Sequence, residues 1–166
     1  MTSLEERVGE LETRLRAAED QLEILGLLNT YGPAVDSGSA EEAAALWTED
    51  GVYDAGGVTR FTPDALVAMY NDTGHQGLVH TGSSHLTATP RIEVHGDEAD
   101  AVAYSFVLVR RDEEWYVMRG AINHWSLVRT PAGWRIKERF NRVLDGTPGS
   151  HEVMRRALTH SPRRAR

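Results

Sequence analysis

A tyrosine and an aspartate lie close together in the stretch Leu27–Asp36 (LLNTYGPAVD), at the end of an apolar helical run. Both side-chain types can transfer protons in an active site. Five helical positions would place Tyr31 and Asp36 about 140° apart, because each residue turns a helix by about 100°. Gly32-Pro33 lies between them, and a proline inside a helix removes a donor and favours a bend. A bend could direct both side chains into one cavity, whereas the plainer interpretation is a buried tyrosine and a helix-capping aspartate.

Histidine is the side chain best suited to gain and lose a proton near neutral pH. His85 lies in the strand-like segment SSHLTATPRIEV, although a single strand histidine is more often a packed or exposed side chain. His75 and His80 precede it at five-residue steps. These steps fit neither a helical zinc pair nor ligands on one strand face, which would be two or four apart. We therefore predict no metal site.

Polar side chains on the predicted strands are further candidates for a binding site. Asn123 and His124 are neighbours, so they face opposite sides of a sheet and only one can line a cavity. Arg139 and Arg142 are three positions apart and also face opposite ways. Arg142 could point inward and anchor a carboxylate or carbonyl group, or it could lie exposed at a strand edge. Aromatic residues that could form a pocket wall, or only a core, are Trp47, Tyr53, Phe106, Trp115 and Trp125.

Composition limits the possible classes of protein. The 166 residues, 40% apolar and 26% charged, suit one globular domain, and the net charge of −7 argues against nucleic acid as a partner. The absence of cysteine excludes disulfides, thiolate zinc sites and cysteine nucleophiles. The chain contains no glycine-rich phosphate loop, G-x-S-x-G or H-E-x-x-H, which argues against a nucleotide cofactor, a serine hydrolase and a zincin-type metalloprotease. No apolar run reaches the roughly 20 residues of a membrane span and no signal peptide is recognisable, so we expect a cytoplasmic protein.

The N-terminal segment has the pattern of a long amphipathic helix. Ser3 and Glu6 have the spacing of a capping box at its start. The helix is predicted to run to about Tyr31 and, past the bend, to Val35. Its heptad seam either joins copies of the chain or packs on its own domain. The apolar residues of this seam alternate at steps of four and three, and they are Leu4, Val8, Leu11, Leu15, Ala18, Leu22 and Leu25.

The remaining elements predict an α+β fold. Two short helices are expected at 40–47 and 62–71, with a short strand at 52–54 between them. Four strands follow at 82–94, 99–110, 115–130 and 134–144, joined by hairpin turns. One face of such a sheet must pack on the three helices and enclose a pocket. We expect an amphipathic extension at 1–21, a domain at 22–146 and a tail at 147–166 that is disordered from Ser161 onward.

Three stretches resemble the SnoaL-like branch of the nuclear transport factor 2-like superfamily, over roughly residues 22–145. They are LEILGLLNTYGPAVDSGSAEEAAALWTEDGVYD, SSHLTATPRIEVHGDEADAVAY and GAINHWSLVRTPAGWRIKERFNRV. The resemblance implies a cone-shaped barrel, in which a curved antiparallel or mixed sheet wraps on about three helices around a deep pocket. Within the superfamily, the chain looks most like small cofactor-free lyases such as bile-acid 7α-dehydratase, scytalone dehydratase and hexachlorocyclohexane dehydrochlorinase.

This resemblance also implies roles for particular residues. Asp36 and His85 fall on the positions of an Asp–His dyad, and Tyr31 falls on that of a catalytic acid. Arg142 falls on a last-strand arginine of the site. Substrate-binding positions of the family correspond to Tyr53 and Asn123, to which the aromatic candidates Trp47 and Phe106 are added.

The expected function is loss of water from a hydrophobic, cyclic molecule such as a steroid or polyketide, without metal or cofactor. The same dyad would serve isomerisation, ring closure or epoxide hydrolysis. A non-catalytic binding module and a structural protein assembled through the heptads are alternatives from other classes. The expected partners are a small hydrophobic molecule and further copies of the chain, with a trimer favoured by the resemblance and a dimer possible. Neither nucleic acid nor a membrane is expected to be a partner.

Overall fold

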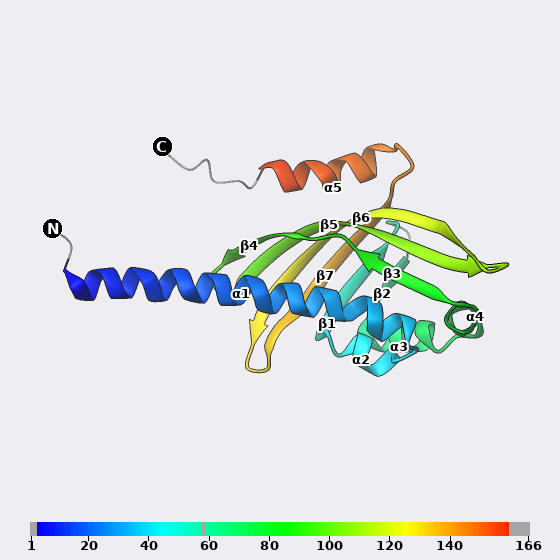
Figure 1. Cartoon of the computed structure of the whole chain (residues 1–166), viewed down its shortest axis with the longest axis horizontal. Coiled ribbons are helices and arrows are strands. Elements are labelled where there is room, and N and C mark those ends of the chain that lie inside the picture. Colours follow the sequence, from blue (N-terminus) through cyan, green and yellow to red (C-terminus); the bar gives the residue numbers. More distant parts are fainter. Residues whose placement is uncertain (1–2, 58, 160–166) are drawn as a thin grey trace.

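The longest element is an N-terminal helix that runs far beyond the body of the protein (Figure 1). The computed structural model describes residues 3–57 and 59–159, and this helix, α1, spans Leu4–Asp36. Ser3 Oγ accepts from the Glu6 N–H at 3.1 Å and a Glu6 carboxylate oxygen accepts from the Ser3 N–H at 2.7 Å, which confirms the capping box. The helix passes unbroken through Gly32-Pro33 and ends at Asp36, so the predicted extension and the first helix of the domain are one element.

A single curved sheet holds all the strands of the described residues. The strands are β1 (Trp47–Ala55), β2 (Thr59–Phe61), β3 (Ser83–Thr87), β4 (Arg91–His95), β5 (Glu98–Arg111), β6 (Glu114–Thr130) and β7 (Gly133–Val143). Their order is β2-β1-β7-β6-β5-β3, and β4 also pairs with β5. The β1–β7 pair is parallel and the other pairs are antiparallel. The sheet is open at both edges, so the cone is not a closed barrel.

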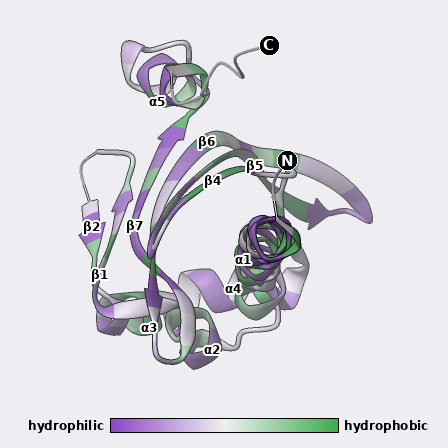
Figure 2. Ribbon diagram, turned by 90° about the vertical axis from the view of Figure 1, so that its left-hand side faces the viewer, coloured by the Kyte–Doolittle hydropathy of each residue, from purple (hydrophilic) through white to green (hydrophobic). Residues whose placement is uncertain are grey.

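The other helices lie on both sides of this sheet. Figure 2 shows the sheet curling around α1, with α2 (Ala40–Ala44), α3 (Pro63–Tyr70) and α4 (Thr73–Thr81) on the same concave side and α5 (Pro148–Thr159) on the opposite side. This confirms the predicted α+β class and the packing of helices on one face. In the described residues, no helix is long and apolar enough to cross a membrane.

Several boundaries differ from those predicted. Residues 73–81 form a helix, and the Asp72 carboxylate caps its N-terminus by accepting from the Gly74 N–H at 2.8 Å. The predicted strand at 82–94 is two strands, β3 and β4, separated at residues 88–90, where Pro90 cannot donate a ladder hydrogen bond. The predicted C-terminal tail contains α5, which begins at Pro148 and buries Val153. The disorder predicted from Ser161 onward lies outside the described residues.

Strand pairing decides which side chains share the concave face. Directly opposite residues point to the same side of a sheet, and successive residues alternate. His85 lies opposite Val107, Ala103 opposite Asn123, and Asn123 opposite Asn141. These side chains therefore point to the concave side. The core on that side is formed by buried residues of α1, α2, α3 and the central strands, including Ile24, Leu28, Val35, Ala43, Leu66, Tyr70, Trp125, Leu127 and Ile136.

Candidate active site

An aspartate and a histidine meet where the end of α1 contacts the edge strand β3. Asp36 is the last residue of α1, and one of its carboxylate oxygens lies 2.7 Å from His85 Nδ1. The other oxygen accepts from the His85 backbone N–H at 2.6 Å, and Ser83 Oγ donates to the first at 2.7 Å. Burial alone would raise the pKa of Asp36, but the hydrogen bonds from His85 and Ser83 outweigh it and hold the pKa below its usual range. Asp36 is therefore a carboxylate at neutral pH.

The close approach of α1 to β3 depends on a glycine. A Cβ atom at Gly32 would overlap the backbone carbonyl oxygen of His85. Because Asp36 is one helical turn beyond Gly32, it lies on the same side of α1 and reaches the same strand. Gly32 and Asp36 are thus four positions apart on α1. The contact that they make with His85 joins two segments 49 positions apart in the sequence.

Aromatic and imidazole rings surround the other side of His85. The Tyr31 ring meets the His85 ring edge to face, with centroids 6.5 Å apart, and the His75 ring lies 6.0 Å away. Tyr31 Oη and Tyr70 Oη form a buried hydrogen bond of 2.8 Å. Burial and the neighbouring Tyr31 raise the pKa of Tyr70 well above its usual value, so Tyr70 keeps its proton. Burial lowers the pKa of His75, which favours a neutral ring there.

A buried arginine lies behind Tyr31. Arg139, on β7, is 4% exposed, and its guanidinium lies 4.5 Å from the ring centroids of both Tyr31 and Tyr53 and 5.5 Å from that of Trp125. Burial alone would lower its pKa, but the tyrosine hydroxyls outweigh that effect and the pKa lies above its usual value. Its Nη1 is buried without a hydrogen-bond partner among the described residues. The aromatic faces thus hold a positive charge in the interior.

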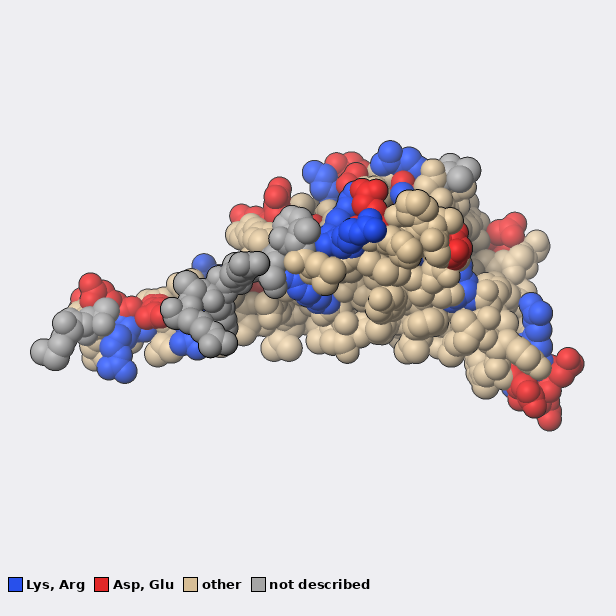
Figure 3. Space-filling view, turned by 90° about the horizontal axis from the view of Figure 1, so that it is seen from above, with Lys and Arg blue, Asp and Glu red and all other residues tan. Residues whose placement is uncertain are grey.

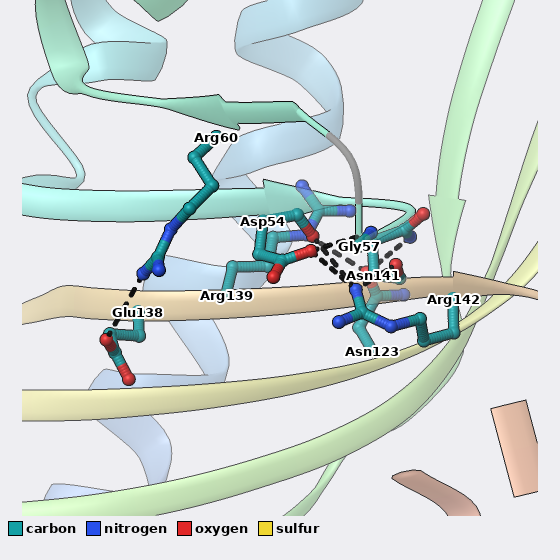
Figure 4. A network of polar contacts seen from close by, with 8 residues as sticks. All are labelled: Asp54, Gly57, Arg60, Asn123, Glu138, Arg139, Asn141 and Arg142. Atoms are coloured by element: carbon teal, nitrogen blue, oxygen red, sulfur yellow. Dashed lines mark hydrogen bonds and ion pairs between the residues drawn. The ribbon is translucent and has the colours of Figure 1, made fainter. Parts of the chain in front are cut away.

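Asn123 holds this arginine, and Asn141 in turn holds Asn123 (Figure 4). Asn123 is fully buried, and its Oδ1 accepts from Arg139 Nε at 3.0 Å and from Asn141 Nδ2 at 2.7 Å. Its Nδ2 donates to Ser105 Oγ at 2.7 Å. Asn123 therefore faces the concave side and its neighbour His124 faces the other. These hydrogen bonds of Asn123 go to other protein groups and not into the groove.

Arg142, the predicted inward anchor, points to the opposite face of the sheet. Its Nη1 donates to an Asp54 carboxylate oxygen at 2.6 Å, and Asp54 also accepts from the Gly57 N–H (Figure 4). The physical reason is a bulge: Ile136 pairs with Leu127 and Glu138 with Ser126, so the extra residue Lys137 reverses the alternation. Arg139 occupies the inward position instead.

Of the five aromatic candidates, Trp125 contacts Arg139, Trp115 is exposed, and the other three have different positions. Phe106 is on the convex face, because it is adjacent to Val107, which shares the face of His85, and it packs over Gly120. The prediction that it lines the pocket is therefore wrong. Trp47 is 5% exposed and packs on Tyr53 within the core. Tyr53 is also buried and contacts Arg139, so it belongs to the interior behind Tyr31.

The space beside the dyad is a groove rather than a deep cavity. It has a volume of about 350 Å³ and is lined by residues of α1 and β3, including Leu28, Pro33, Asp36, His85 and Thr87. The His85 side chain is 17% exposed. The interior behind the ring is occupied by Tyr31, Tyr70 and Arg139, so the open side of His85 is the side of the groove.

Four residues of this site were not identified from the sequence. Ser83 is two positions before His85, and that spacing on one strand face is a signal that could have identified it. The inward position of Arg139 could be predicted only with the bulge at Lys137 known. Tyr70 and His75 come from α3 and α4, and only the tertiary structure brings them to the dyad.

The chain matches proteins of known family and structure over most of its length. A model of the SnoaL-like domain matches residues 16–140. An NTF2-like protein with a cystatin-like fold from Novosphingobium aromaticivorans is 35% identical, with 93% of this chain and 98% of that chain covered and a TM-score of 0.85. No curated protein matches.

More distant solved structures share the fold alone. A putative aromatic ring hydroxylase from Novosphingobium aromaticivorans is 21% identical, with 76% of this chain and 90% of that chain covered and a TM-score of 0.64. ActVI-ORFA from Streptomyces coelicolor is also 21% identical, with 74% and 96% covered and a TM-score of 0.65.

Proposed function

The chain belongs to the SnoaL-like family, and from that premise we propose that it is a cofactor-independent lyase of the dehydratase type. The observation that carries the proposal is the 2.7 Å contact between Asp36 and His85 Nδ1, at the edge of a groove. The substrate class is a hydrophobic, cyclic molecule with a carbonyl group next to the carbon that loses its proton, such as a steroid or polyketide.

His85 acts as the general base. Asp36 accepts the Nδ1–H, which leaves Nε2 with its lone pair available to take a proton. The carboxylate also stabilises the imidazolium that forms. A positioned base of this kind contributes about 10²–10⁴-fold to the rate, so other groups must supply the remainder of the acceleration.

Tyr31 and Arg139 supply the electrophilic side of the site. Tyr31 is adjacent to the His85 ring, and its hydroxyl is held by Tyr70, which retains its own proton. The buried charge of Arg139 lies against the Tyr31 ring and favours negative charge on a nearby oxygen. Tyr31 is buried beside the His85 ring and does not line the groove, so the proposal requires a substrate oxygen that reaches past this ring to the Tyr31 hydroxyl. Tyr31 then donates to the oxygen that becomes an enolate or to the departing hydroxyl.

The bond changes balance without an added reagent. The C–H proton moves to His85 Nε2, and its electron pair forms the new carbon–carbon double bond as the C–O bond breaks. The hydroxyl takes a proton from Tyr31 and leaves as water. The proton on His85 then returns to Tyr31 through solvent, so the enzyme ends as it began.

The experiment is a double-mutant cycle on the dyad. A panel of cyclic β-hydroxyketones serves as substrate, and the absorbance of the conjugated enone reports turnover. His85→Ala and Asp36→Ala should each abolish nearly all activity, and the double variant should be little worse than either single variant. Small additive losses would contradict a dyad. Exchange of ketone α-protons in heavy water, followed by NMR, tests the base even where no panel compound has a suitable leaving group.

Binding without turnover is the second candidate, and the close packing behind His85 favours it. In that case Asp36 would only fix the contact between α1 and β3. Panel ligands would then raise the melting temperature, while neither dehydration nor proton exchange would be observed.

A further inference from the structure

The N-terminal part of α1 carries an apolar stripe that its own domain does not cover. This part of the helix projects from the body (Figure 1), and side chains of both charges follow it (Figure 3). The exposed fractions are 75% for Leu4, 44% for Val8, 58% for Leu11, 59% for Leu15 and 67% for Leu22. Single exposed leucines are ordinary, but four leucines and a valine in heptad register on one helix indicate an interface.

The domain attaches to the opposite side of the helix. Asp20 is buried, forms an ion pair of 2.8 Å with Arg129 and accepts from Trp134 Nε1 at 3.3 Å. Asp20 is two positions from Leu22, and two positions are about 200° apart around a helix. The stripe therefore faces away from the sheet, and the alternative in which the seam packs on its own domain is excluded for residues 4–22.

Charges beside the stripe identify the partner and its orientation. With Val8, Leu15 and Leu22 at heptad position a, position g holds Arg7 and Arg14, and position e holds Glu5, Glu12 and Glu19. In parallel helices, each g residue meets the e residue five positions later in the neighbouring helix. Arg7 would meet Glu12 of a second copy, and Arg14 would meet Glu19.

An antiparallel arrangement of the two helices would bring like charges together. It would place g residues opposite g residues and e residues opposite e residues, so that arginine faces arginine and glutamate faces glutamate. Exposed ion pairs contribute only about 0.2–1 kcal/mol each, so the leucines supply the association energy and the charges select the direction.

We propose that α1 joins copies of this chain in a parallel, in-register coiled coil through residues 4–25. The bodies then lie on the outside of the helices, on the Asp20 side. The inference does not depend on the proposed lyase activity, because it uses no residue of the groove.

Light scattering on the full chain tests the association. The wild-type protein should have at least twice the mass of one chain, and Leu11→Glu with Leu15→Glu should reduce it to one. The matched control adds the same charge outside the seam at Gly9→Glu with Thr13→Glu, and it should keep the wild-type mass. A wild-type monomer, or a seam variant of unchanged mass, would overturn the proposal. Circular dichroism checks that both variants stay folded.

Cysteine cross-linking tests whether the helices are parallel. The sequence contains no cysteine, so each introduced thiol can pair only with its copy in another chain. In parallel helices, Leu11→Cys brings two thiols together across the seam, whereas Thr13→Cys places them on the far side of each helix. Disulfide-linked pairs should form much faster for Leu11→Cys under mild oxidation. Equal rates for the two variants would refute the parallel register, even if the mass showed an oligomer.

Discussion

The two faces of the curved sheet each carry an aspartate–histidine pair with the same separation and different surroundings. On the concave face, Asp36 holds His85 Nδ1 at 2.7 Å, and two further donors fix the carboxylate. On the convex face, Asp100 lies 2.7 Å from His124 Nε2, and the ring stacks on Phe140. Equal distances therefore do not make equivalent sites.

The difference lies in what the second ring nitrogen can reach. His85 borders the groove between α1 and β3 and the Tyr31 ring. His124 lines a separate space on the convex face with Asp100 and Val102, and its Nδ1 is buried with no hydrogen-bond partner among the described residues. The arginines show the same division: Arg139 is buried among aromatic rings, and Arg142 is neutralised by Asp54. A charge buried without a carboxylate partner is costly unless hydrogen bonds and aromatic faces compensate for the lost water.

The largest expected effect is the difference in turnover between variants of the two histidines. His85→Gln should lower turnover by about 10²–10⁴-fold, because it removes the base. His124→Gln should leave turnover within about twofold, since its ring does not border the groove. Steady-state kinetics on the same panel compound compares them, and equal losses would show that the two faces are not functionally distinct.

The two arginines should separate activity from stability. Arg139→Met should lower turnover by roughly 10²-fold through loss of the buried charge. It should change the free energy of unfolding little, because a buried charge is replaced by an apolar chain. Arg142→Met leaves Asp54 without its partner, so it should lower stability by about 1 kcal/mol and keep activity. Urea denaturation and kinetics together test this, and a reversed pattern would contradict the assignment of faces.

Two glycines of α1 should respond oppositely to alanine. Gly32→Ala introduces a Cβ against the His85 carbonyl and should cost about 1–3 kcal/mol. At Gly26 there is nothing within 4 Å, so Gly26→Ala should stabilise the helix by about 0.5–1 kcal/mol. Thermal or chemical unfolding measures both. A neutral Gly32→Ala would mean that the contact between α1 and β3 is looser than described.

The smallest effect concerns acid stability. Because the pKa of Asp36 is lower in the folded chain than its usual value of about 3.9, its contribution is complete above about pH 4. That contribution is lost as the pH falls through the folded-state pKa. Asp36→Asn should therefore show a smaller loss of stability on acidification than the wild type, whereas Asp50→Asn, at an exposed position, should follow the wild type. Parallel acid curves for Asp36→Asn and the wild type would contradict the role of its hydrogen bonds.

Much of the fold was predictable from local patterns. The heptad seam and capping box identified α1, and alternation with turn residues identified the long strands β5, β6 and β7. Local signals failed where neighbours in space decide the outcome. The segment 73–81 contains few apolar residues, so its local pattern does not predict a helix. Phe106 is a different case, because the inward alternation of Ala99, Ala101 and Ala103 is a local pattern that already directs it to the other face.

The sequence by itself determined the types of the catalytic candidates and the helix and strand that carry them, because heptads, alternation and turns are local properties. The family resemblance implied that Asp36 pairs with His85, but only the tertiary structure shows the contact, since a chain pattern contains no distance between segments 49 positions apart. It also decided that Arg139 rather than Arg142 points inward, because one extra residue at Lys137 reverses every later side chain of the strand.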